Sequence, residues 1–79
     1  MILLTIDDAV RTRIQELLKE QHTKIATVSL AGGLTPSTVY DFMRGTTQHI
    51  QLNTVKQLCM GFNITLSEFF DRAYFNDYE

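Results

Sequence analysis

The chain has 79 residues, a formal net charge of −2 and 44% hydrophobic residues, which is enough for one modest core and too little for two domains. The single cysteine, Cys59, excludes an internal disulfide, no Cys/His cluster has metal-ligand spacing, and no apolar run approaches the ~18 residues of a membrane helix. We therefore expect one small cytoplasmic domain over residues 1–79, without cofactor, metal or evident small-molecule ligand.

The first predicted helix covers about residues 6–21. Thr5 and Asp8 have the T-x-x-D spacing of a capping box, in which each side chain accepts a hydrogen bond from the other residue's backbone N–H. Apolar residues then repeat at helical spacing and predict one buried stripe: Ile6, Val10, Ile14, Leu17 and Leu18. Ile2–Leu4 lie outside this stripe and could staple the helix start or pair with another chain.

Two short helices follow, at about 25–32 and 36–44, joined by Gly32-Gly33, where glycine accepts the positive φ of a tight turn. Thr35 is placed to cap the second of these helices, and Pro36 stands at its first position, where a missing N–H costs nothing. Its buried face is Val39, Phe42 and Met43, so its outer face is Ser37, Thr38, Tyr40, Asp41 and Arg44. Two short helices with a glycine turn and a polar outer face are typical of a helix-turn-helix.

The remaining pattern predicts a polar connection at 45–51, a fourth helix at about 52–61 and a short fifth helix. Cys59 lies on the apolar stripe of the fourth helix and is expected to be an inert core thiol. Gly61 is expected to allow a close contact, and Asn63 suits a left-handed helix cap. Thr65 and Glu68 form a second capping box, which opens a helix through Phe69 and Phe70 and toward Tyr74. No strand pattern occurs, so the fold class is all-α with five helices.

Charge is distributed unevenly along the chain. Residues 19–56 carry a local charge of +2, from Lys19, Lys24, Arg44 and Lys56 against Glu20 and Asp41, whereas residues 1–18 carry −1 and residues 57–79 carry −3. Because non-specific affinity for nucleic acid comes from phosphate neutralisation, this small excess predicts weak, salt-sensitive binding by each monomer. The excess lies where the helix-turn-helix lies.

Three segments in order resemble the lambda-repressor-like helix-turn-helix domain (Xre-type, Cro-like), a compact five-helix DNA-binding fold of bacterial and phage regulators. They are GLTPSTVYDFMRG (33–45), LNTVKQLCMGFNI (52–64) and TLSEFFD (65–71). The resemblance covers about residues 6–71 and leaves 72–79 as a short tail. It implies a transcriptional repressor that binds a partly palindromic operator in double-stranded DNA as a homodimer, associated with the nucleoid.

The resemblance also implies which residues meet DNA. Those facing base edges are Pro36, Ser37, Thr38 and Asp41, and those flanking them are Tyr40 and Arg44. Those approaching the sugar-phosphate backbone are Lys24, Ile25, Thr46, Thr47 and Gln48. Other roles are open: Arg44 can serve the helix dipole, Ser37 and Thr38 can bond local backbone groups, and Asp41 can be a solvated charge.

A second interpretation is a protein-interaction module on the same fold, such as an antitoxin-like or anti-regulator partner. The acidic net charge, the outward-facing Leu30 and the aromatic tail favour it. Candidate dimer surfaces are Ile2–Leu4 and the tail residues Tyr74, Phe75 and Tyr78, all of which could instead pack within the chain. An enzyme is not expected, because no nucleophile, base and orienting group can be assembled from these residues.

Overall fold

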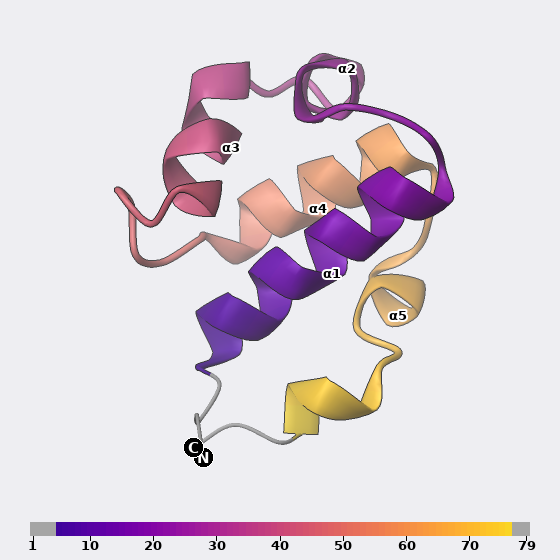
Figure 1. Ribbon diagram of the computed structural model, residues 1–79. Coiled ribbons are helices and arrows are strands. Elements are labelled where there is room, and N and C mark those ends of the chain that lie inside the picture. Colours follow the sequence, from indigo (N-terminus) through magenta and orange to yellow (C-terminus); the bar gives the residue numbers. More distant parts are fainter. Residues whose placement is uncertain (1–4, 77–79) are drawn as a thin grey trace.

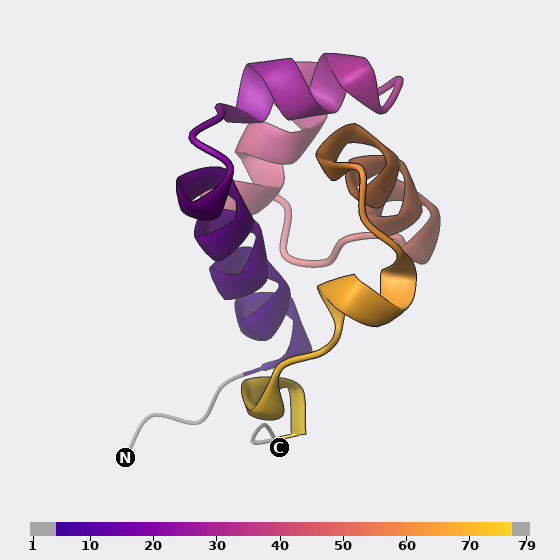
Figure 2. The same cartoon turned by 90° about the vertical axis from the view of Figure 1, so that its right-hand side faces the viewer.

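The computed structural model describes residues 5–76 as five α-helices followed by one 3₁₀ turn (Figures 1 and 2). In chain order the elements are α1 (Ile6–Glu20), α2 (Ile25–Ala31), α3 (Pro36–Met43), α4 (Leu52–Phe62), α5 (Leu66–Phe69) and η1 (Ala73–Asn76). No strand occurs in this range. The predicted all-α fold is confirmed, and the predicted bounds of the first four helices agree to within one residue.

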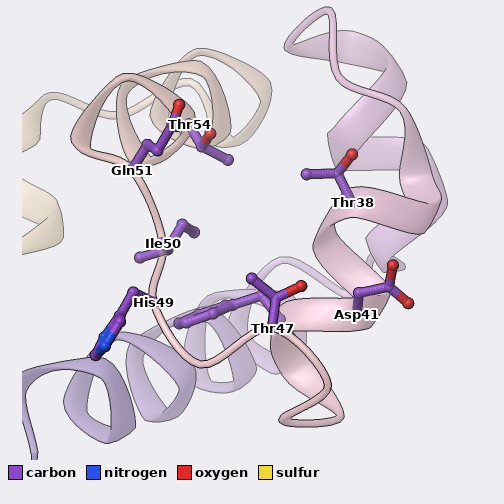
Figure 3. A pocket seen from close by; sticks show the side chains of 8 residues that line it. Thr38, Asp41, Thr47, His49, Ile50, Gln51 and Thr54 are labelled. Carbon is purple, nitrogen blue, oxygen red and sulfur yellow. The ribbon is translucent and has the colours of Figure 1, made fainter.

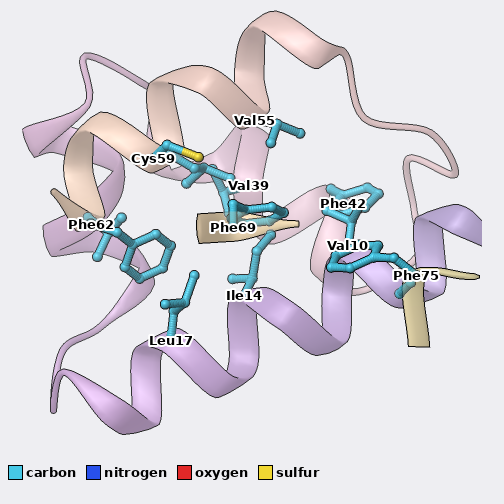
Figure 4. Packing of buried hydrophobic residues seen from close by; sticks show 13 residues of the cluster. Val10, Ile14, Leu17, Val39, Phe42, Val55, Cys59, Phe62, Phe69 and Phe75 are labelled. Atoms are coloured by element: carbon cyan, nitrogen blue, oxygen red, sulfur yellow. The ribbon is translucent and has the colours of Figure 1, made fainter. Parts of the chain in front are cut away.

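A single cluster of buried side chains joins these elements, with α1 and α4 facing each other across it (Figure 4). Its members are Ala9, Val10, Ile14, Leu17, Val28, Val39, Phe42, Val55, Leu58, Cys59, Phe62, Phe69 and Phe75. The predicted core position of Cys59 is confirmed, and burial raises the pKa of its thiol. A buried thiol with a raised pKa is a poor nucleophile.

Both predicted capping boxes are present. The Thr5 hydroxyl accepts from the Asp8 N–H at 3.1 Å, and the Thr65 hydroxyl accepts from the Glu68 N–H at 3.0 Å. Each carboxylate accepts the backbone N–H of its threonine in return. Because these bonds favour the charged form, they hold the pKa of Asp8 below its ordinary value of 3.8 and that of Glu68 below 4.5.

Three helices end in the same left-handed turn, at His22, Gly33 and Asn63, whose φ angles are 52°, 79° and 61°. In each case the next residue donates its N–H to a carbonyl five positions back, as in a Schellman motif. The turns at Gly33 and Asn63 were predicted from the residue types. The turn at His22 was not, because histidine only tolerates this conformation and does not signal it.

Helices α2 and α4 pack at very short distance because glycine stands at the contact on both sides, Gly61 within α4 and Gly32 directly after α2. A Cβ on Gly61 would lie 2.2 Å from the carbonyl oxygen of Val28, and one on Gly32 would lie 2.1 Å from that of Gln57. Ser29 is fully buried on the same side of α2. The predicted close contact at Gly61 is therefore confirmed, and it fixes the position of the helix-turn-helix on the rest of the molecule.

The fifth helix is shorter than predicted, because α5 ends at Phe69 and Tyr74 belongs to the separate turn η1. Arg13 of α1, which is 4% exposed, donates from Nε to the Phe69 carbonyl at 2.7 Å and from Nη2 to the Glu68 carbonyl at 2.9 Å. These two bonds tie the last turn of α5 to α1, where its carbonyls have no partner further along the helix.

The described part of the tail packs against the molecule itself. Phe75 is buried at ring-centroid distances of 5.0 Å from Phe70 and 6.2 Å from Phe69. Tyr74 donates its hydroxyl to Glu16 at 2.6 Å, and burial together with that carboxylate raises the tyrosine pKa. Of the candidate dimer surfaces, Tyr74 and Phe75 are thus used within the chain. Ile2–Leu4 and Tyr78 lie outside the described residues.

Candidate nucleic-acid interface

The turn between α2 and α3 is built from backbone hydrogen bonds around Gly33. The Leu34 N–H donates to the Ser29 carbonyl at 2.7 Å, and the Gly33 N–H donates to the Leu30 carbonyl at 3.1 Å. Thr35 then takes the N-cap position of α3, as predicted, but its hydroxyl makes no capping bond, and the Thr38 N–H bonds its carbonyl instead at 3.0 Å. This turn sets the angle at which α3 leaves α2.

Helix α3 buries one face and presents the other to solvent. Val39 and Phe42 are buried and Met43 packs partly against the core, as predicted. The side chains expected to face bases or their flanks lie on the opposite side. Of these, Ser37, Thr38, Tyr40 and Arg44 are exposed, whereas Pro36 and Asp41 are half-buried.

Arg44 and Asp41 are joined in an ion pair across one turn of α3, which places a cation over the only acidic side chain of that helix. The Arg44 Nη2 lies 2.7 Å from the Asp41 Oδ1, with the two side chains 65% and 42% exposed. The spacing i, i+3 on a helix brings such side chains together, so the ion pair is recognisable from the sequence. At this exposure the pair is weak, and the guanidinium keeps free donors for another anion.

The segment after α3 is held against α1 by two side chains that the sequence interpretation did not single out. Arg11 donates to the carbonyls of Phe42, Thr47 and Gln48 at 2.7, 3.2 and 3.0 Å. Asp7 accepts the Ile50 N–H at 3.3 Å, and its Oδ2 lies 2.6 Å from the His49 Nδ1. The predicted backbone-contacting residues of this segment are all exposed: Thr46, Thr47 and Gln48.

A groove of about 330 Å³ separates the exposed face of α3 from the start of α4 (Figure 3). Its lining combines hydroxyl, amide, carboxylate and imidazole groups with two apolar side chains: Thr38, Asp41, Phe42, Thr47, His49, Ile50, Gln51 and Thr54. Figure 3 shows Thr38 and Asp41 on α3 opposite Gln51 and Thr54 at the beginning of α4. The groove thus links the exposed face of α3 to the following segment in one concave surface.

The remaining predicted contacts lie at the start of α2. Lys24 is the N-cap residue of α2, is exposed, and makes no side-chain capping bond. Ile25 packs partly against the core, so only its backbone N–H is available for a phosphate. Among residues 5–76 no lysine forms an ion pair, Lys24 included.

Among residues 5–76, three large apolar side chains are more than 60% exposed. Leu30 on α2 is 67% exposed, and Leu52 and Met60 on α4 are 67% and 61% exposed. The exposed Leu30 agrees with its predicted outward position. In the part of the chain that is described, no helix has both the length and the apolar character needed to cross a bilayer, and no group of three or more His, Cys, Asp or Glu is arranged to hold a metal ion.

Residues 13–73 match the family model of the Cro/C1-type helix-turn-helix DNA-binding domain. The match includes all of α2, α3, α4 and α5, together with the turn at Gly33. No curated protein and no solved structure matches the chain significantly.

Proposed function

Because the chain belongs to the Cro/C1-type helix-turn-helix DNA-binding family, we propose that it is a transcriptional repressor that recognises a specific, partly palindromic site in double-stranded DNA. In this proposal α3 lies in the major groove, and two copies of the chain occupy two half-sites about one helical turn apart. The observation that carries the proposal is the polar outer face of α3, continuous with the exposed segment that follows it.

The proposed base contacts come from the first turn of α3 and the turn after it. The exposed hydroxyls of Ser37 and Thr38 can bond to base edges, and Pro36 offers apolar contact to a thymine methyl. Asp41 can accept from a cytosine amino group. The pairing of Asp41 with Arg44 at 2.7 Å lowers the repulsion between this carboxylate and nearby phosphates.

The proposed backbone contacts surround that face. Lys24 and the Ile25 N–H reach phosphates from the start of α2, and Tyr40 and Arg44 reach them from the flanks of α3. The segment after α3 contributes Thr46, Thr47 and Gln48. Such contacts fix the register of the protein on the duplex and carry no sequence information themselves.

Selection of bound duplexes from a random pool tests this function directly. We expect the purified protein to enrich one site with two-fold symmetry, with an affinity that falls steeply as salt rises because phosphate contacts release counterions. Sedimentation of the protein with the enriched duplex is expected to give two chains per duplex. A pool without enrichment would contradict sequence-specific binding.

Arg44→Ala is expected to weaken binding to the enriched site and to random duplex by about the same factor, roughly tenfold, because a phosphate contact is independent of base sequence. The slope of log K against log salt is expected to fall by about one. Fluorescence anisotropy titrations at several salt concentrations measure both quantities.

A double variant separates the two consequences of removing Arg44. The single substitution deletes a cation and also uncovers the Asp41 carboxylate. In Arg44→Ala/Asp41→Asn a neutral amide replaces the Asp41 carboxylate. Any loss of affinity of this double variant relative to Asp41→Asn alone therefore reports the phosphate contact of Arg44. Unchanged affinity between these two variants would show that Arg44 touches no phosphate.

The exposed Leu30, Leu52 and Met60 favour a second candidate, a protein-interaction module that keeps the same fold. An apolar protein interface weakens little with salt, whereas DNA binding weakens steeply. If the protein shows no salt-sensitive binding to any duplex but retains a partner at high salt, and Leu30→Ser or Met60→Ser releases that partner, this second function is the correct one.

A further inference from the structure

Arg11 is the central link between α1 and the segment that follows α3. Its side chain is 19% exposed and reaches three parts of the chain. Nε donates to the Phe42 carbonyl in the last turn of α3, Nη2 donates to the carbonyls of Thr47 and Gln48, and Nη1 donates to Asp8 at 3.1 Å. The guanidinium carbon also lies 4.3 Å from the centre of the Phe42 ring.

This set of contacts needs the planar fork of arginine. Four N–H groups that point in fixed directions meet acceptors on three separate segments while the guanidinium lies over an aromatic ring. A lysine ammonium is a compact point charge and cannot hold all of these acceptors at once. Four of the five N–H groups of Arg11 are thus engaged inside the molecule, three of them with α3 and the segment after it.

The Arg11 bonds also fix the direction of two backbone N–H groups. All described peptide bonds are trans, and in a planar trans peptide the C=O and the N–H of the next residue point in opposite directions. The Thr47 and Gln48 carbonyls face Arg11, so the N–H groups of Gln48 and His49 point away from it. Neither N–H has a hydrogen-bond partner among residues 5–76.

Asp7 holds the far end of the same segment. Its carboxylate accepts the Ile50 N–H and contacts the His49 ring, so the segment is tied to α1 on both sides of the two free N–H groups. Successive N–H groups on one side of the backbone bind anionic oxygens. The segment therefore presents two donors in a fixed direction before any ligand arrives.

We propose that Arg11 is a positioning residue for DNA binding, which holds the segment after α3 so that the N–H groups of Gln48 and His49 meet a backbone phosphate. This inference rests on the proposed DNA-binding function. It assigns the contact to the main chain, whereas the side chains of Thr46, Thr47 and Gln48 supply only additional polar contacts. A preset segment avoids the entropic cost of ordering it on binding.

The test compares amide NMR spectra of the wild type and of Arg11→Lys, with and without a short duplex of arbitrary sequence at low salt. In the wild type, DNA is expected to shift the Gln48 and His49 amides more than the Ile50 amide, which is already bonded to Asp7. In Arg11→Lys, which keeps the charge, those two shifts are expected to disappear and affinity to fall about tenfold. The amides of Ser37 and Thr38 are expected to shift in both proteins.

Arg72→Lys is the matched control, because Arg72 is a surface arginine 3.6 Å from Glu16 and Glu20 and makes no bond to the segment after α3. Its affinity and amide shifts are expected to equal those of the wild type. If Arg11→Lys binds as tightly as the wild type with the same Gln48 and His49 shifts, the role of Arg11 is wrong while the proposed function stands.

Two other outcomes are decisive. If the wild-type spectrum does not respond to DNA at all, both the proposed function and the role of Arg11 are wrong. If thermal unfolding shows that Arg11→Lys does not fold, the wild-type titration decides whether the Gln48 and His49 N–H groups contact a phosphate. Equal shifts of the Gln48, His49 and Ile50 amides would overturn that contact.

Discussion

Gly61→Ala is expected to lower the free energy of unfolding by about 3 kcal/mol, a large part of what a domain of this size has. The new Cβ would lie 2.2 Å from the carbonyl oxygen of Val28 and 2.9 Å from its Cγ1. One obstacle is backbone, so α2 itself must move. Inside a helix alanine is intrinsically more stable than glycine by ~1 kcal/mol. A net loss of stability in Gly61→Ala therefore comes from the clash where α2 and α4 cross. Urea unfolding followed by circular dichroism measures it.

Gly45→Ala serves as the comparison. Gly45 has a φ of 83°, but an added Cβ would meet nothing within 4 Å. The cost is then backbone strain alone, about 1–2 kcal/mol. If Gly61→Ala proved as stable as the wild type, the close crossing of α2 and α4 would be disproved. Because that crossing orients α3, Gly61→Ala is also expected to weaken DNA binding at temperatures where it remains folded.

Arg13→Met is expected to cost about 3 kcal/mol of stability. The substitution keeps an apolar stem in a site that is 4% exposed and removes the donors to the Phe69 and Glu68 carbonyls. The Phe69 carbonyl then loses its donor, and an unsatisfied buried acceptor costs ~1–3 kcal/mol. The Arg13 Nη1 has no hydrogen-bond partner and lies 3.6 Å from the Glu16 Oε1, so its loss adds little. Urea unfolding at neutral pH gives the value.

Arg72→Met is the matched substitution at the surface. Arg72 approaches Glu16 and Glu20 only at 3.6 Å and is 36% exposed, so its removal is expected to cost at most about 1 kcal/mol. Equal losses in the two variants would mean that Arg13 contributes to stability as a general surface charge. A larger loss in Arg13→Met shows that it joins α5 to α1.

The features that could be predicted from the sequence are local ones. Capping boxes depend on residues three apart, and the left-handed turns at Gly33 and Asn63 depend on one residue type each. The periodicity that placed Val39 and Phe42 in the core depends on a single helix. Each of these features depends on residues a few positions apart, so the sequence alone indicates it.

The candidate interface was only partly accessible to the same reasoning. The outward position of Ser37 and Thr38 follows from the period of α3. The spacing of three between Asp41 and Arg44 on one helix also indicates an ion pair, but the sequence interpretation gave the two residues separate roles. No sequence pattern indicates that Asp7 anchors the segment after α3, because its partners lie 42 and 43 residues away.

Arg11 and Arg13 mark the boundary between the two kinds of information. The sequence by itself determined the helices, their caps, the polar face of α3 and the family resemblance. Only the tertiary structure decided that Arg11 bonds the segment after α3 while Arg13, two positions later, bonds the end of α5. Side chains two apart on a helix point in different directions. Their partners are backbone carbonyls, which every residue carries, so no residue type in the sequence marks them.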